Sequence, residues 1–404
     1  MSIGGKTFDE ALASLSDMTG GMVAIGRDEH LARIARAQAR MRELDIDAIY
    51  LNAGTNLAYF TGTKWHPSER MVGAILPADG ALEYIAPAFE ECTLQGFMVV
   101  EGRVNCWEEH ESPYALFADV LGRMGVVQSD AAPARVGMCE SAPWFIADGV
   151  RKAAPGYALE NAALVTTFCR ARKSPAEIAL MQRVKDMTLE VHKAAASILY
   201  EGISTTEVEE FIARAHRKVG APGSYFCIVL FGEATAYPHG VNYVQKLQRG
   251  DMVLIDTGCK VMGYISDITR SYVFGEPTER QRFVWNAEKA AQAAAFDAAQ
   301  PGTPCRKVDE AARASLVANG FGPGYKLPGL PHRTGHGIGM DIHEGPYLVG
   351  SDETPLDTGM CFSNEPMICI PGEFGIRLED HFYMSAEGPR WFTQPSHSIE
   401  KPFG

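Results

Sequence analysis

The strongest constraint on how this chain folds is an apolar segment that ends in a carboxylate. Residues 252–255 (Met-Val-Leu-Ile) are typical of a buried strand, and Asp256 follows directly. A second acid, Asp267, comes eleven residues later, after a segment that contains Gly258 and Gly263. If that segment helps to turn the chain back, the two strands are neighbours and their carboxylates converge. Carboxylates that close repel each other unless a cation joins them.

The two acids alone leave two interpretations open, because Asp267 could simply pair with Arg270. Three later motifs favour a metal site, since each places one metal-capable side chain in an apolar or Gly-rich setting: His336 in GHGIG, Glu365 in SNEP and Glu379 in RLED. Four carboxylates and one imidazole make a complete ligand set. Oxygen-rich ligation with one nitrogen suits manganese, cobalt or ferrous iron, whereas structural zinc prefers thiolates and histidines.

The length of the chain, 404 residues, exceeds what one hydrophobic core usually serves and predicts two domains. In the first part, apolar residues recur at helical spacing from Asp28 to Leu44. Short apolar segments then predict strands over 48–51, 72–77 and 82–86. The first ~165 residues therefore have an α/β character.

A second unit is predicted to begin near Lys173. Ser174 can accept the exposed N–H of Glu177, Glu177 can reach back, and Pro175 is pre-shaped for a first helical turn. Helical patterns run from there to about Tyr200 and over 205–219 and 279–299, with strand-like segments between and after them. This unit is predicted to be α+β.

Charge and cysteine usage exclude several classes of partner. The formal net charge of −13 disfavours binding to nucleic acid and to anionic membranes. We expect no secretory signal, because the first thirty residues lack a basic start followed by an apolar run, and no segment is long and apolar enough to span a bilayer. Nine cysteines without CxxC spacing fit reduced thiols and predict a cytoplasmic protein.

The five motifs, in this order, resemble those of the aminopeptidase P, prolidase and creatinase family. The resemblance covers the whole chain and is greatest to bacterial Xaa-Pro dipeptidases. It implies an α+β fold in which a pita-bread catalytic domain, residues 169–404, follows a creatinase-like α/β amino-terminal domain, residues 1–168. By the same resemblance we expect a homodimer.

The resemblance also implies a role for each metal-capable side chain. Asp256 would bind one metal ion, Asp267 and Glu379 would bridge two, and His336 with Glu365 would complete the other. The cofactor would be two divalent ions, manganese above all, with cobalt, zinc or iron as alternatives.

Three further histidines match positions of the family: His239 in YPHG, His332 in PHRT and His343 in DIHE. They would line the substrate pocket and, with Glu365, serve catalysis. A lone histidine is often a structural residue, and for His239 and His332 that alternative stays open. His343 follows His336 by seven residues across a glycine turn, so a loop can point both rings into one cleft.

Two residues are predicted to support the ligands without binding metal. Arg377 stands two residues before Glu379, on the same strand face, and can steady that carboxylate or another acid. Tyr225 resembles a tyrosine that lies near the bridging aspartate in several prolidases. The alternatives are a surface charge for Arg377 and a core aromatic for Tyr225.

The implied reaction is hydrolysis of the peptide bond before proline in Xaa-Pro dipeptides or short peptides. Many prolidases have an arginine just before a Leu-x-x-Gly-Met segment, but residues 354–360 have none nearby. Arg333, which replaces a smaller residue common in the family, could bind the substrate carboxylate instead. The alternatives are an aminopeptidase that prefers longer peptides, a non-peptidase hydrolase or lyase on the same site, and a binding protein without activity.

Overall fold

A computed structural model describes residues 3–127 and 132–403 of the chain, which divides into two compact units. One unit is Ile25–Arg170, and the other joins Met1–Ala24 to Ala171–Gly404. We refer to them as the amino-terminal unit and the catalytic unit. Among the described residues, no helix combines the length and the apolar character needed to cross a bilayer.

The start of the chain differs from the expected division at residue 168. The short helix α1 (Phe8–Ala13) belongs to the catalytic unit, and the ring of Phe8 lies 5.2 Å from that of Phe211. Ala11 and Leu15 join the same core. This contact joins residues about 200 positions apart, so no pattern within the segment could indicate it. The division into family domains 1–168 and 169–404 stays a prediction.

A six-stranded mixed sheet forms the centre of the amino-terminal unit, in the order β4-β3-β2-β1-β5-β6. The predicted α/β character is present, and the predicted helix over 28–44 and the three predicted strands correspond to α2, β1, β2 and β3. The strands are β1 (Ala48–Asn52), β2 (Gly73–Pro77), β3 (Glu83–Pro87), β4 (Arg103–Trp107), β5 (Ala134–Met138) and β6 (Tyr157–Asn161). The helices are α2 (Arg27–Glu43), α3 (Thr55–Thr61), η1 (Ala88–Glu90), α4 (Glu91–Phe97), α5 (Pro113–Arg123), α6 (Trp144–Ala153) and α7 (Ala163–Ala171).

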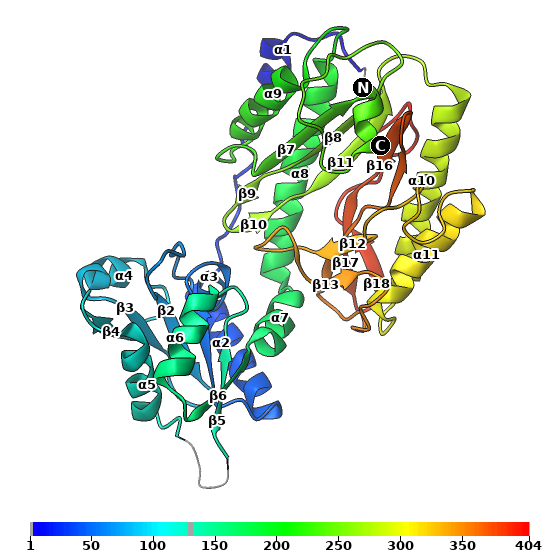
Figure 1. The fold of residues 1–404 in the computed structure, drawn as a ribbon. Helices are drawn as coiled ribbons and strands as arrows, with labels where there is room; N and C mark the ends of the chain where they lie inside the picture. The colour runs from blue at the N-terminus through cyan, green and yellow to red at the C-terminus, as the bar shows by residue number, and fades with distance from the viewer. Residues whose placement is uncertain (1–2, 128–131, 404) are drawn as a thin grey trace. The chain divides into compact units, whose positions relative to one another are not determined.

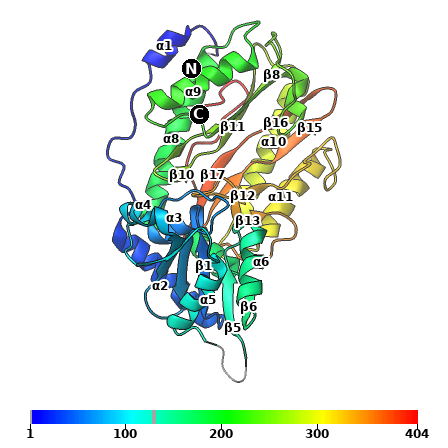
Figure 2. The ribbon, with the colours of Figure 1, turned by 60° about the vertical axis from the view of Figure 1, so that its left-hand side comes forward.

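Two pairs of helices flank the strands of the catalytic unit (Figures 1 and 2). One pair is α8 (Pro175–Ser197) and α9 (Thr205–Lys218), and the other is α10 (Glu279–Ala298) and α11 (Cys305–Ala318). Helix α8 begins at the predicted capping box: Ser174 Oγ accepts the N–H of Glu177 at 3.2 Å, and the Glu177 carboxylate accepts the N–H of Ser174 at 2.9 Å. Both bonds satisfy backbone donors that the helix itself leaves free.

Strand β8 (Met252–Gly258) is buried on both faces, which explains its continuous apolar sequence. It lies between β7 (Phe226–Phe231) and β11 (Ile268–Val273) in an antiparallel sheet of order β11-β8-β7. Val253 and Ile255 pack into the core under α8 and α9, whereas Met252 and Leu254 pack into the core under α10 and α11. Because side chains alternate along a strand, Asp256 follows Leu254 onto the α10 side.

A second sheet of the catalytic unit has the order β13-β12-β14-β17-β18. Its strands are β12 (Gly335–Gly337), β13 (Glu344–Leu348), β14 (Cys361–Asn364), β17 (Asp380–Ser385) and β18 (Gly388–Trp391). Two hairpins complete the unit, β9 (Lys260–Val261) with β10 (Tyr264–Ile265) and β15 (Met367–Ile370) with β16 (Phe374–Arg377), together with the short helix η2 (Gly232–Ala236). The α+β prediction for this part of the chain is confirmed.

Candidate metal centre

The two aspartates are brought together by the hairpin that separates them. Strands β8 and β11 are antiparallel neighbours in which Asp256 pairs with Thr269, and Asp267 immediately precedes β11. At the tip of the intervening hairpin, Met262 and Gly263 both have positive φ, 50° and 92°, which turns the chain back within two residues. Both carboxylates are buried at the same end of neighbouring strands.

The other three predicted ligands come from adjacent strands of the second sheet. His336 is on β12, Glu365 directly follows β14, and Glu379 directly precedes β17. The Glu379 N–H donates to Thr269 O at 3.2 Å, and this bond joins β11 to the segment between β16 and β17. Residues more than 100 positions apart in the sequence therefore meet at the junction of the two sheets.

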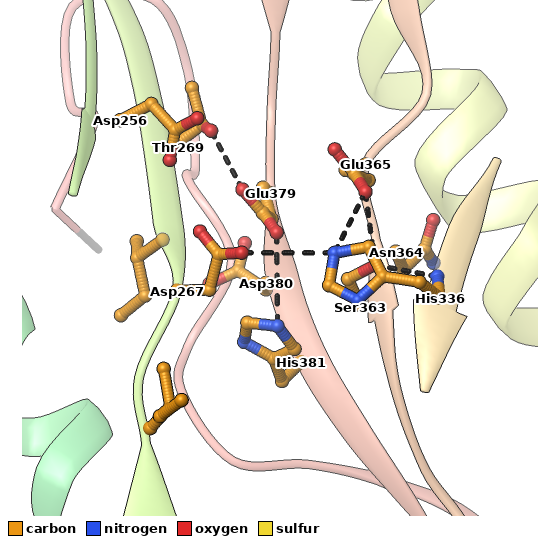
Figure 3. Close-up of polar contacts among 12 residues, drawn as sticks. Asp256, Asp267, Thr269, His336, Ser363, Asn364, Glu365, Glu379, Asp380 and His381 are labelled. Carbon is orange, nitrogen blue, oxygen red and sulfur yellow. Dashed lines mark hydrogen bonds and ion pairs between the residues drawn. The ribbon is translucent and has the colours of Figure 1, made fainter. Parts of the chain in front are cut away.

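The side chains of Asp267, His336 and Glu379 converge at this junction (Figure 3). Each offers one ligand atom, and these atoms all lie within 4.8 Å of one another. His336 Nε2 is 3.2 Å from Glu365 Oε1 and 3.7 Å from Asp267 Oδ2. The three residues are buried and form a possible metal-binding cluster, which Glu365 adjoins through His336.

The donor atoms of this cluster fit a cation. Asp256 Oδ1, Asp267 Oδ1 and Glu379 Oε1 are buried and have no hydrogen-bond partner in the described part of the chain. The remaining ring nitrogen of His336, Nδ1, lies 3.0 Å from Gly337 O, a carbonyl that can only accept, so Nδ1 carries the hydrogen. Nε2 then presents a lone pair toward two carboxylates, an arrangement that a metal ion between them satisfies.

The pKa values of the buried carboxylates also indicate a cation site. Burial, together with the neighbouring Glu379, Asp256 and Glu365, raises the pKa of Asp267 well above its usual range. Burial and the carboxylates of Glu365 and Asp256 likewise raise the pKa of Glu379. Without a cation, these groups would hold protons at a pH at which exposed acids are ionised. A divalent ion removes that penalty.

Arg377 contacts Asp256 and not Glu379 directly. Its Nη2 donates to Asp256 Oδ2 at 2.5 Å, and its Nε donates to Thr269 Oγ1 at 3.0 Å. Thr269 Oγ1 in turn donates to Glu379 Oε2 at 2.7 Å. Arg377 is buried, so this guanidinium orients one predicted ligand by contact and a second through Thr269.

A cavity of about 500 Å³ opens beside the cluster. Its lining includes the three other predicted histidines, His239, His332 and His343, and also Arg333. The ring of His343 stands edge-on to that of His336, with 4.3 Å between the centroids. Burial and then the neighbouring His336 lower the pKa of His343 to about 4, so its imidazole is neutral near pH 7. His332 Nε2 is buried and has no hydrogen-bond partner among the described residues.

Two predicted residues, Arg333 and Tyr225, have their ring contacts with residues outside the cluster. The guanidinium of Arg333 stacks over the ring of Tyr347, 4.4 Å from its centre, within the cavity wall. Tyr225 is 48% exposed and contacts the Lys260 ammonium, which lies 5.6 Å from its ring centre. The cavity lining includes two nearby residues of strand β7, Phe226 and Ile228. The proposed support of Asp267 by Tyr225 stays a prediction.

The sequence interpretation did not include His381, whose Nε2 lies 3.7 Å from Glu379 Oε1. The signal was present, because residues two apart on a strand share a face. Nor did it identify Thr269. Arg270, the alternative partner considered for Asp267, instead forms an ion pair with Asp380 at 2.7 Å, and both side chains are fully buried.

The profile described as "Metallopeptidase family M24" matches residues 179–386, and the one described as "Creatinase/Prolidase N-terminal domain" matches residues 33–172. "Probable dipeptidase PepE" of Mycobacterium tuberculosis is 32% identical over 363 residues, covering 88% of this chain and 92% of that protein. The crystal structure of dipeptidase PepE from Mycobacterium ulcerans has a TM-score of 0.86 at 31% identity, covering 93% of this chain and 98% of the other. Prolidase from Thermococcus sibiricus has a TM-score of 0.79 at 30% identity, covering 90% and 97%.

Proposed function

Because this chain belongs to metallopeptidase family M24, and its relatives include dipeptidases and a prolidase, we propose that it hydrolyses the peptide bond before proline in Xaa-Pro dipeptides or short peptides. The protein is a metallopeptidase with a pita-bread catalytic domain and a creatinase-like amino-terminal domain. The observation that supports the reaction most is the buried cluster of Asp267, His336 and Glu379 beside a cavity that His343 lines.

The proposed cofactor is a pair of divalent metal ions. Among the candidate metals, manganese suits four carboxylates and one imidazole best. Asp256 would hold one ion, His336 with Glu365 the other, and Asp267 with Glu379 both. When bound, the ions supply Lewis acidity toward the scissile carbonyl and lower the pKa of a water molecule. Cobalt, zinc or iron are the alternatives.

The side chains around the ions have separate tasks. Glu365 Oε1 lies 3.2 Å from His336 Nε2, beside the cluster. The ionised Glu365 can accept a proton from the attacking water and deliver it to the leaving nitrogen. The neutral imidazole of His343 can donate an N–H to the oxyanion that develops on the carbonyl. His239 and His332 would line the peptide-binding part of the cavity.

Arg333 is the proposed partner of the substrate carboxylate. It lies in the cavity wall, and its stacking on Tyr347 limits the side-chain freedom that binding would otherwise remove. We expect Arg333→Ala to raise the KM for Xaa-Pro dipeptides by about 10-fold, the value of one charge-assisted hydrogen bond, while kcat changes little. Tripeptides, whose carboxylate is one residue further away, are the control. An unchanged KM for dipeptides would remove Arg333 from carboxylate binding.

The direct test of the proposed function is release of proline from Xaa-Pro dipeptides and of Pro-Yaa from Xaa-Pro-Yaa tripeptides. The protein is assayed with manganese, after chelation, and as the Asp267→Ala variant. Cleavage that is lost in both controls supports a metal-dependent prolyl peptidase, and the preferred length separates a dipeptidase from an aminopeptidase. Absence of cleavage with metal bound would favour the non-peptidase hydrolase or lyase.

Two further properties remain proposals, the first from the resemblance and the second from the cysteines. We expect a homodimer, which light scattering of the purified protein can measure. We also expect a cytoplasmic location, in agreement with nine cysteines that are all free thiols in the structure.

A further inference from the structure

His381 is a fully buried histidine on the same face of its strand as Glu379. Its Nε2 lies 3.7 Å from Glu379 Oε1. A dashed line joins the two side chains in Figure 3. Neither ring nitrogen has a hydrogen-bond partner in the described residues, and the same holds for Glu379 Oε1. Buried polar atoms are rarely left unpaired, so two unpaired atoms that face each other indicate that the two side chains interact.

The backbone of β17 sets the position of this ring. His381 pairs with Ser363 of β14, and its carbonyl accepts the N–H of Phe392 at 2.9 Å. The other oxygen of the Glu379 carboxylate, Oε2, accepts the hydroxyl of Thr269 at 2.7 Å. The carboxylate therefore has Thr269 on one oxygen and His381 beside the other.

The ring can supply the donor that Glu379 Oε1 lacks. An imidazole carries at least one N–H, and neither ring nitrogen of His381 has another hydrogen-bond partner in the described residues. Donation from Nε2 to Glu379 therefore breaks no existing hydrogen bond.

We propose that His381 is a positioning residue of the metal centre, whose Nε2–H donates to Glu379 Oε1 and holds that carboxylate in the orientation that binds metal. This inference rests on the proposed role of Glu379 as a ligand. At 3.7 Å the contact is longer than a hydrogen bond. Since Thr269 holds only one oxygen, a small rotation of the carboxylate brings Oε1 and Nε2 into range.

The test compares two substitutions with different donors. His381→Phe occupies similar space and has no N–H, whereas His381→Gln keeps a donor. The dissociation constant for Co²⁺ is measured by titration of the metal-free protein and read from its visible absorption. We expect His381→Phe to weaken Co²⁺ binding by about 10- to 100-fold and His381→Gln to restore most of the loss. The absorption bands of the saturated variants should keep the wild-type positions, because the ligands are unchanged.

A double-substitution cycle adds a second readout. In the Glu379→Ala background, His381→Phe should have no further effect on Co²⁺ affinity, because the group it positions is absent. Circular dichroism checks folding, and His381→Met replaces the Phe variant if that variant does not fold. Wild-type affinity in the donor-free variant would overturn the proposal. A second outcome would also overturn it: His381→Gln does not restore Co²⁺ affinity, and its absorption bands shift in the same way as those of a His336→Gln variant. His381 would then be a metal ligand itself.

These measurements do not depend on the substrate. If Xaa-Pro peptides are not cleaved but Co²⁺ affinity falls as expected, the role of His381 stands and only the proposed reaction fails. If the wild-type protein binds no Co²⁺ at this site, both fail together.

Discussion

Glu379 and Asp380 are adjacent carboxylates, both buried, with opposite environments. Asp380 Oδ1 accepts from Arg270 at 2.7 Å and from Thr393 at 2.8 Å, and its Oδ2 accepts from Gln292 at 3.2 Å. Glu379 has Thr269 on one oxygen and no hydrogen-bond partner for the other among the described residues. Alternation along the strand turns the two side chains to opposite faces.

The difference separates a structural acid from a ligand. Asp380 has its counterion within the fold, so its charge is compensated without any added ion. Glu379 lies with Asp267 and His336, and it forms no direct ion pair with a Lys or Arg of the described residues: Arg377 reaches it only through Thr269. A buried carboxylate with unsatisfied oxygens therefore marks the face of the strand where a cation belongs. Three substitutions would break or sharpen this distinction.

The largest effect is expected on the metal-binding face, for Asp267→Asn. Loss of one ligand should lower kcat/KM by at least about 10³-fold, since the metal ions contribute several kcal/mol to the transition state. Bound metal, measured by mass spectrometry, should fall as well. With metal present, the variant should melt below the wild type. After chelation, the variant should have the higher melting temperature, because one of the mutually repelling carboxylates has become neutral. A variant that keeps full metal content and activity would contradict the assignment of Asp267.

On the opposite face, Asp380→Asn should act on stability. The substitution leaves the Arg270 guanidinium buried without its counterion and turns an amide N–H₂ group toward other donors. We expect the free energy of unfolding to fall by about 3–5 kcal/mol, with or without metal, as measured by chemical denaturation. Folded protein should still bind metal in the wild-type stoichiometry. Loss of metal without loss of stability would remove the distinction between the two acids.

A third buried acid, Glu288 on α10, has neither a metal cluster nor an ion-pair partner among the described residues. Burial raises its pKa well above 4.5, so the native state keeps a proton that the unfolded chain loses. The wild type therefore loses stability as pH rises above about 4.5, and Glu288→Gln does not. At pH 8 we expect the variant to be more stable by about 1–3 kcal/mol, the cost of the unpaired group.

The control for Glu288→Gln is its pH dependence. Denaturation of metal-saturated protein at pH 5 and pH 8 should show a gain that shrinks toward zero at the lower pH. A gain of equal size at both values would contradict the raised pKa of Glu288, because the gain would then not come from ionisation of this group.

The sequence determined the local structures and the types of side chain at the site. The capping box at Ser174, the helices that follow it and the apolar strand before Asp256 depend on contacts within a few residues, so they could be predicted from spacing alone. The same holds for the placement of Glu379 beside a strand.

Only the tertiary structure decided which partner each charge received. Arg270 could have paired with Asp267, three residues away, but the meeting of β11 with the segment before β17 gives it Asp380, 110 residues away. The same meeting leaves Glu379 Oε1 facing His381. A separate contact between distant segments packs Phe8 against Phe211 of α9. Such pairings depend on strand register and on contacts between distant segments, and local spacing holds no information about either.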